Sequence, residues 1–233
     1  MKLEICANSY QSVLNAQNAG ADRIELCSEL SVGGVTPSYG LLEKVAKNST
    51  IPIHVLARPR SGNFSYSDEE FKQMKTDINI CKELGFQGIA SGILLKDNTI
   101  DMERTKELIA LTKPLSFTFH RAFDCVPNPL ESLYQLIDLQ VDRILTSGQK
   151  NTAVEGLELL KKIKEKADNQ LIILPASGIN EQNILHFKEV GFTEVHASAS
   201  KKINSNSPFF DTTNQTVSDI NIIKKMLKKL NNV

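Results

Sequence analysis

Two cysteines occupy matching positions in two short segments that alternate polar and apolar residues. Cys6 lies two residues after Glu4 in LEICA, and Cys27 lies two residues after Glu25 in RIELC. A buried cysteine alone commonly serves as a small hydrophobic residue, but two at the same offset on neighbouring strands would lie side by side. Paired thiolates suit a soft ion, above all Cu(I). The sequence therefore predicts that Cys6 and Cys27 bind Cu(I), with another Cys, Met or His as a third ligand.

A second set of residues has side chains that transfer protons. His120, Arg121 and Asp124 fall within five residues of the segment FTFHRAFD, at the end of an apolar stretch. Histidine titrates close to neutral pH, and a neighbouring carboxylate commonly orients such a base. We expect His120 or Glu25 to act as the acid or base, and Asp124 to orient the base or Arg121.

Arginine side chains indicate an anionic ligand. Arg58 and Arg60 flank a proline in RPRSG, where the stiffened backbone would hold both guanidinium groups ready for a carboxylate or phosphate. The turns at Ser147–Gly148 and Ser177–Gly178 can present backbone amides to the same anion. The alternative for the two arginines is a salt bridge to Glu4, Glu25 or Asp124. The residues predicted to bind the anion are Glu4, Arg58, Arg60, Arg121, Ser147, Gly178 and His196.

Four similar segments predict the elements that position these residues. In each, a helix ends and a short apolar strand begins two or three residues later; they are 18–29, 84–92, 139–148 and 190–199. Three carry glycine where a left-handed residue is needed, at Gly20, Gly85 and Gly191, and the fourth carries Gln140. The other expected strands are 3–7, 51–57, 115–121 and 170–176. The expected helices are about 9–19, 38–48, 67–84, 101–112, 129–139, 152–167, 180–190 and 217–231.

Eight alternations of strand and helix predict an α/β fold, a (β/α)8 TIM-type barrel forming one domain over 1–233. The long loops follow strands, so function is expected at the carboxyl ends of the strands. The longest loop, 197–218, precedes a closing helix at 219–231 and is predicted to act as a lid or to be partly disordered, with Pro208–Phe210 as an anchor.

Composition restricts the partners. Twenty-seven Lys and Arg residues balance 27 Asp and Glu residues, which argues against general attraction to nucleic acid or to a membrane surface. The amino-terminal residues contain no apolar secretion signal, and no apolar run approaches the length of a membrane span. We expect a cytoplasmic protein with no organic cofactor, bound to a copper ion or a small anionic molecule.

Several of these segments together resemble the CutC family, the copper homeostasis proteins, over nearly the whole chain. The similar segments, in the family's order, are ADRIELCSELSVGGVTPSYG, HVLARPRSGNFSYSDEEF, FTFHRAFD, RILTSG and GIN at 178–180. The resemblance implies a TIM-type barrel, a cytoplasmic location, a homodimer or higher homo-oligomer, and Cu(I) bound by Cys6 and Cys27. This chain departs from the family at Ala90–Ser91 and in the turn LPASGIN at 174–180.

Three functions stay open on the residues alone. The first is copper homeostasis through Cu(I) bound by the cysteine pair. The second is a cofactor-independent lyase, isomerase or hydrolase acting on a small anionic metabolite, which would use the carboxylates and arginines that a soft cation does not need. The third is a non-catalytic ligand-binding or regulatory subunit.

Overall fold

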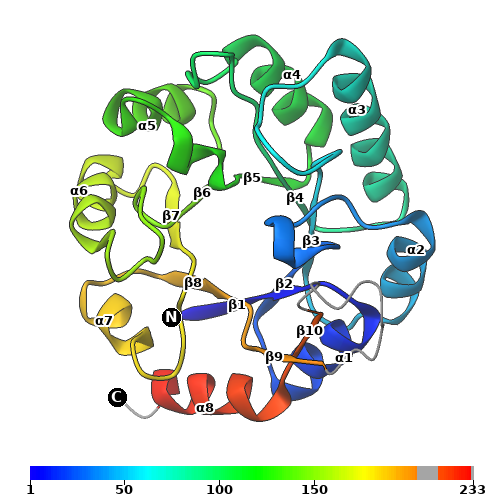
Figure 1. Cartoon of the computed structure of the whole chain (residues 1–233), viewed down its shortest axis with the longest axis vertical. Helices are drawn as coiled ribbons and strands as arrows, with labels where there is room; N and C mark the ends of the chain where they lie inside the picture. Colours follow the sequence, from blue (N-terminus) through cyan, green and yellow to red (C-terminus); the bar gives the residue numbers. More distant parts are fainter. Residues whose placement is uncertain (204–214, 232–233) are drawn as a thin grey trace, which may run out of the picture.

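The computed structural model describes residues 1–203 and 215–231, and its centre is a barrel of parallel strands (Figure 1). The barrel strands are β1 (Lys2–Ala7), β2 (Arg23–Leu26), β3 (Ile53–Leu56), β4 (Gly88–Ser91), β5 (Ser116–Phe119), β6 (Arg143–Thr146), β7 (Ile172–Pro175) and β8 (Glu194–Ala197). Their order is β7-β6-β5-β4-β3-β2-β1-β8, so sequential strands are neighbours and the chain follows the predicted (β/α)8 plan.

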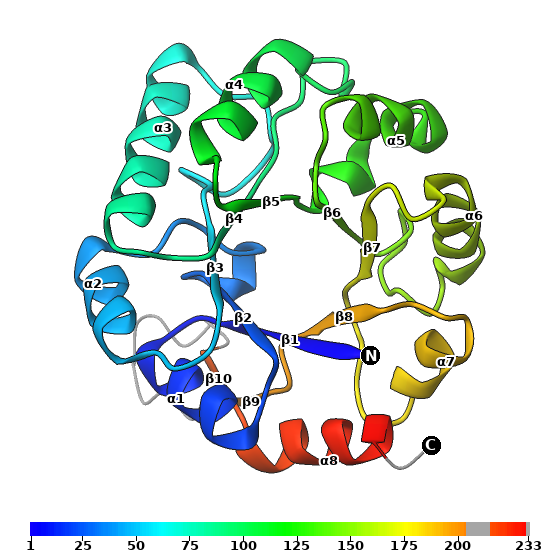
Figure 2. The same ribbon diagram turned by 180° about the vertical axis from the view of Figure 1, so that it is seen from behind.

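Helices surround the strands on the outside, as Figures 1 and 2 show from opposite sides. They are α1 (Tyr10–Ala19), α2 (Tyr39–Asn48), α3 (Asp68–Glu83), α4 (Met102–Thr112), α5 (Pro129–Asp138), α6 (Leu157–Ala167), α7 (Ile184–Glu189) and α8 (Ile220–Asn231). Strand residues with branched or aromatic side chains, such as Ile5, Ile24 and Phe117, pack against this layer and are fully buried or nearly so. The alternating residues of each strand therefore face the barrel interior, where many of them are polar.

The turns from helix to strand adopt the predicted left-handed conformation. The φ angles are 91° at Gly20, 81° at Gly85 and 84° at Gly191, and Gln140 takes the same region with a φ of 58°. Each of these four residues stands one or two positions after the last residue of a helix, and the next strand begins within a few residues. These short connections leave the longer strand-to-helix loops at the opposite end of the barrel.

The helices after β6 and β7 begin later than the periodicity predicts. The helix expected at 152–167 starts at Leu157, and the residues before it form turns that end at Gly156, the residue that caps the helix. The helix expected at 180–190 is shortened to Ile184–Glu189. Its first residues form a turn in which Asn183 Nδ2 donates to the Gly178 carbonyl at 2.8 Å. Local side-chain bonds of this kind compete with helix formation.

The long loop after β8 contains two strands that the sequence did not predict. β9 (Ser200–Lys202) and β10 (Thr216–Ser218) pair antiparallel, so the last helix starts at Ile220 instead of 217. Asn8 Nδ2 donates to the Thr216 carbonyl at 3.1 Å, which holds β10 against the end of β1. The expected anchor at Pro208–Phe210 lies outside the described residues, and the lid stays a prediction.

Two short 3-10 helices occupy strand-to-helix loops, η1 (Leu30–Val32) after β2 and η2 (Arg121–Cys125) after β5. None of the helices in the described residues has both the length and the apolar character needed to cross a membrane.

Candidate functional site

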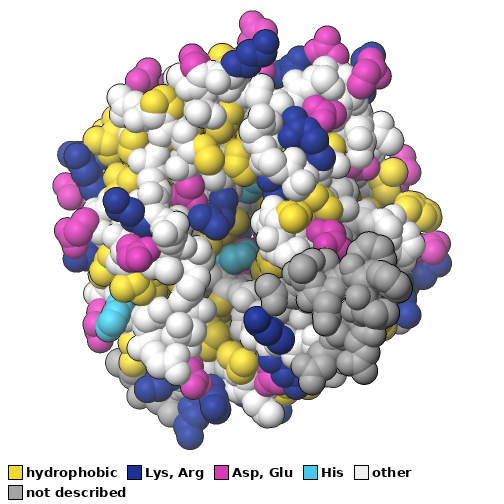
Figure 3. All heavy atoms as spheres, in the orientation of Figure 1, with side chains coloured by type: hydrophobic (Ala, Val, Ile, Leu, Met, Phe, Trp, Pro, Cys, Tyr) yellow, Lys and Arg dark blue, Asp and Glu magenta, His cyan; other side chains and the backbone are white. Residues whose placement is uncertain are grey.

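A cavity of about 500 Å³ opens at the carboxyl ends of the strands. Figure 3 shows it as a hollow at the centre of this face, with a histidine side chain inside. The polar residues that contribute to its wall include Cys6, Glu25, Arg58, His120, Arg121 and His196. Five barrel strands and the loops that follow them supply these residues, so the fold does bring together side chains that are far apart in the sequence.

The predicted thiol pair is brought together in the structure. Cys6 Sγ lies 3.6 Å from Cys27 Sγ, and both side chains are buried. The hydrogen bond to Cys27, burial, and the negative charge of Glu25 together raise the pKa of Cys6 well above its ordinary value. Cys6 contributes to the cavity wall, whereas Cys27 lies next to it and is completely buried.

His196 lies between two carboxylates at the same place. Its Nδ1 is 2.7 Å from Glu4 Oε1, and its Nε2 is 3.6 Å from Glu25 Oε2. Burial alone would lower the pKa of His196, but Glu25 and Glu4 together raise it above its ordinary value. Burial also raises the pKa of Glu25. Cys6, Glu25 and His196 form one group, whose nearest donor atoms all lie within 4.8 Å of one another.

A buried ion-pair network lies beneath this group, and we call Glu4, Arg23, Arg143 and Glu194 the base network. Arg23 Nε bonds Glu4, Arg23 Nη2 lies 2.5 Å from Glu194 Oε2, and Arg143 Nε lies 3.1 Å from the same oxygen. Burial would raise the pKa of Glu4, but the His196 hydrogen bond and the Arg23 charge hold it well below its ordinary value. Glu4 therefore supports His196 from below instead of lining the cavity for an anion.

Arg23 and Arg143 support the site but were not predicted from the sequence. The alternation of side chains along the strand could have revealed Arg23, because it precedes Glu25 by two residues and therefore faces the barrel interior as Glu25 does. An arginine at the inner face of a barrel strand needs a buried acidic partner.

His120 belongs to the cavity wall, and one of its ring nitrogens is buried without a hydrogen-bond partner among the described residues. The backbone N–H of Ala122 donates to Nδ1 at 3.2 Å, so the ring proton resides on Nε2, which has no hydrogen-bond partner among the described residues. The ring packs on Phe64 with centroids 4.9 Å apart. Burial and the nearby charge of Arg58 lower the pKa of His120 to about 3. His120 is therefore neutral at physiological pH and offers one N–H.

The buried neutral state of His120 predicts a specific acid sensitivity. Between the unfolded pKa near 6.5 and the folded pKa of about 3, the unfolded chain binds the proton and the folded chain does not. Stability is thus lost as pH falls, by about 2–3 kcal/mol from this residue between about pH 6.5 and 4.5. We expect His120→Asn to remove this part of the pH dependence in urea unfolding. The exposed His186→Asn is the control, and equal pH dependence in both variants would contradict the assignment.

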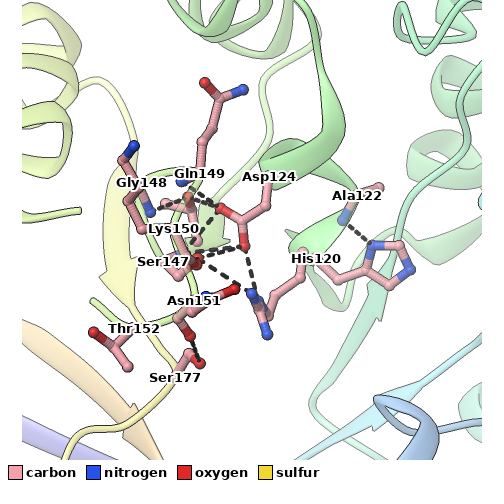
Figure 4. Close-up of polar contacts among 12 residues, drawn as sticks. His120, Ala122, Asp124, Ser147, Gly148, Gln149, Lys150, Asn151, Thr152 and Ser177 are labelled. Carbon is pink, nitrogen blue, oxygen red and sulfur yellow. Dashed lines mark hydrogen bonds and ion pairs between the residues drawn. The ribbon is translucent and has the colours of Figure 1, made fainter. Parts of the chain in front are cut away.

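Asp124 positions Arg121 and not His120. Its carboxylate accepts hydrogen bonds from Arg121 Nε at 2.8 Å, Thr146 Oγ1 at 2.5 Å and the backbone N–H of Ser147 at 3.0 Å (Figure 4). Figure 4 also shows the His120 ring on the far side from this cluster. Of the two roles predicted for Asp124, only the contact with Arg121 is present. The hydroxyl of Ser147 donates to the Lys150 carbonyl at 2.5 Å and thereby stabilises its own loop.

The two arginines of the RPRSG loop bond to neighbouring loops and to Glu70 of α3, and so stabilise the protein's own structure. Arg58 donates to the carbonyls of Val32, Gly34 and Gly62 at 2.7–3.0 Å, which ties the loops after β2 and β3 together. Arg60 Nε lies 2.5 Å from Glu70 Oε1. The alternative of salt bridges from these arginines to Glu4, Glu25 or Asp124 is wrong, because Arg58 bonds backbone carbonyls and Arg60 pairs with Glu70.

The turn after β7 contributes backbone to the cavity wall. Ser177 and Gly178 both have left-handed φ angles, of 80° and 71°, and both line the cavity. The Ser177 hydroxyl donates to the Asn151 carbonyl at 2.7 Å, as Figure 4 shows. An anion held by amides of this turn stays a prediction.

Comparisons with known proteins agree with this architecture. The model of the CutC family matches residues 1–201. A CutC family protein of Pasteurella multocida is 47% identical over 210 residues, which cover 90% of this chain and 86% of the relative. The human copper homeostasis protein cutC homolog is 44% identical over 208 residues, covering 89% of this chain and 76% of the relative.

A solved structure gives the same result in three dimensions. The crystal structure of a copper homeostasis protein CutC from Streptococcus agalactiae superposes with a TM-score of 0.80 at 33% identity, covering 85% of this chain and 98% of that one. Sequence and fold thus agree with one another, and the chain belongs to the CutC family.

Proposed function

We propose that this CutC protein takes part in copper homeostasis by binding Cu(I) as cargo, in the cytoplasm, through Cys6 and Cys27. The observation that carries the proposal is the 3.6 Å separation between the two sulfur atoms, one of which, Cys6 Sγ, belongs to a residue of the cavity wall. With a metal–sulfur bond of about 2.3 Å, as for zinc, two sulfurs that share one ion lie no more than about 4.6 Å apart. The thiols therefore fit one ion with little movement.

The surroundings of the pair also suit a soft cation. Cys6, Cys27, Leu56 and Ala90 form one apolar cluster inside the barrel, packed against Leu30. Thiolates in an apolar setting favour Cu(I) over the harder divalent ions, and binding displaces the thiol protons. In a reducing compartment two adjacent thiols stay available to the metal and do not form a disulfide.

The test is the Cu(I) affinity of anaerobically reduced protein, measured by competition with a chromogenic chelator. We expect Cys6→Ser and Cys27→Ser each to weaken binding about a hundredfold or more, because a single thiolate is a poor Cu(I) site. Cys125→Ser is the matched control, since Cys125 is an exposed thiol in the same cavity wall and should leave the affinity unchanged. Equal affinity in the parent and all three variants would refute the proposal.

A second candidate function is catalysis on a small anionic molecule, favoured by the donors at the cavity wall. At the cavity wall the half-exposed guanidinium of Arg121 is held in place by Asp124, and the neighbouring His120 carries an unpartnered Nε2–H that a small rotation of the ring would present to a ligand. Such fixed donors bind an oxyanion and polarise a carbonyl group. Refutation of the copper proposal would leave this function as the better explanation of the cavity.

A further inference from the structure

Three donor atoms of different chemistry meet at the cavity, and the Cu(I) proposal uses only one of them. Cys6, Glu25 and His196 come from the adjacent strands β1, β2 and β8, and their nearest donor atoms lie within 4.8 Å of one another. All three side chains are at least nine-tenths buried. A carboxylate is a hard ligand that adds little affinity for Cu(I), so the position of Glu25 beside Cys6 and His196 calls for another ion.

The spacing suits a tetrahedral divalent ion. Ligand atoms bound at about 2.0–2.3 Å to one zinc ion stand roughly 3.3–3.7 Å apart. His196 Nε2 and Glu25 Oε2 are already separated by 3.6 Å. The remaining pairs need to close by about 1 Å at most, which small side-chain rotations provide.

Glu4 and Arg23, which are not ligands themselves, orient the His196 ring for metal binding. Its Nδ1 lies 2.7 Å from Glu4 Oε1, while the other oxygen of Glu4 is bonded by Arg23. A carboxylate accepts a hydrogen bond and so fixes the ring proton on Nδ1. In the neutral ring the Nε2 lone pair then lies on the side of Glu25, and a metal ion bound there takes the place of a proton. A carboxylate behind a histidine in this way is the usual support of a metal-bound imidazole.

The cavity supplies the remaining coordination position. Cys6, Glu25 and His196 all line it, whereas Cys27 is completely buried. Zinc sites with three protein ligands keep a fourth position for water or for an oxygen of a small molecule. We propose that Cys6, Glu25 and His196 bind one Zn²⁺ ion that is open to the cavity. This site goes beyond Cu(I) binding, and because both use Cys6, the two metals exclude each other.

The test is zinc affinity of the reduced full-length protein, by competition between Zn²⁺ and a chromogenic zinc chelator. We expect Glu25→Gln and His196→Gln each to weaken zinc binding at least tenfold, and Cys27→Ser to leave it unchanged. In the same three variants Cu(I) affinity should show the opposite pattern, with a large loss only in Cys27→Ser. The two proposals can therefore fail separately.

Two further measurements distinguish the loss of the zinc site from misfolding of a variant. Zinc should raise the melting temperature of the parent and of Cys27→Ser, but not of Glu25→Gln. Co²⁺ in place of Zn²⁺ should give thiolate-to-metal absorption that disappears in Cys6→Ser and persists in Cys27→Ser. A parent that takes no zinc from the chelator, folded ligand variants that bind zinc as the parent does, or equal loss in Cys27→Ser would each overturn the zinc site.

Discussion

Arg23→Met is expected to lower the free energy of unfolding by about 3–5 kcal/mol at neutral pH. The Arg23 side chain is 6% exposed and bonds both Glu4 and Glu194, whose side chains are each 4% exposed. Methionine keeps most of the volume but removes the charge, so two buried carboxylates lose their shared partner. Urea unfolding followed by circular dichroism measures the difference.

An exposed ion pair provides the control for Arg23. Lys47 lies 2.9 Å from Glu43 on α2, with 67% and 42% of the two side chains exposed. Lys47→Met breaks that pair and should change stability by less than about 1 kcal/mol. A similar small effect from Arg23→Met would show that the base network does not hold the barrel together.

Gly156→Ala is expected to destabilise the protein by about 3 kcal/mol, because no room exists for a methyl group. A Cβ at this position would lie 1.9 Å from the Ser147 carbonyl oxygen and 2.9 Å from Gly148 Cα. Both contacts are with backbone, which cannot rotate away. The loop after β6 would have to open, and its Ser147 N–H would move from Asp124.

A second glycine tests whether the effect is local. Gly40 lies in α2, and the position that an alanine methyl group would take there has no neighbouring atom within 4 Å. Gly40→Ala should therefore stabilise the helix by up to about 1 kcal/mol. Urea unfolding of the two variants should give changes of opposite sign. Destabilisation of similar size in both variants would contradict this prediction, because it would show that replacing any glycine lowers stability whether or not the methyl group meets Ser147.

The barrel was predictable because its signals are local. Gly20, Gly85, Gly191 and the less expected Gln140 each mark the end of a helix a few residues before an apolar strand. A helix end and a strand start depend on neighbours in sequence, so one chain is enough to find them. The short strands β9 and β10 carry no comparable apolar run, and they form through pairing with each other and contact with β1.

The site was predictable only in part, because loop contacts decide what each side chain does. Strand alternation correctly placed Cys6 and Cys27 on inward faces, and their thiols do meet. The strand register was not predictable, because it sets Cys6 opposite Glu25 and not opposite Cys27. The predicted anion-binding role of Arg60 depends on contacts that are distant in sequence. Its guanidinium lies against Glu70 of α3, and no spacing within RPRSG reveals that partner.

The base network also has a consequence for folding specificity. Its members come from β1, β2, β6 and β8, and each must face inward to meet the others. A slip of one strand by a single residue would turn its charged side chain towards the apolar helix layer. An unpaired charge buried there costs several kcal/mol, so misaligned barrels lie well above the native one in free energy. The base network thus discriminates strongly between one way of closing the barrel and every shifted alternative.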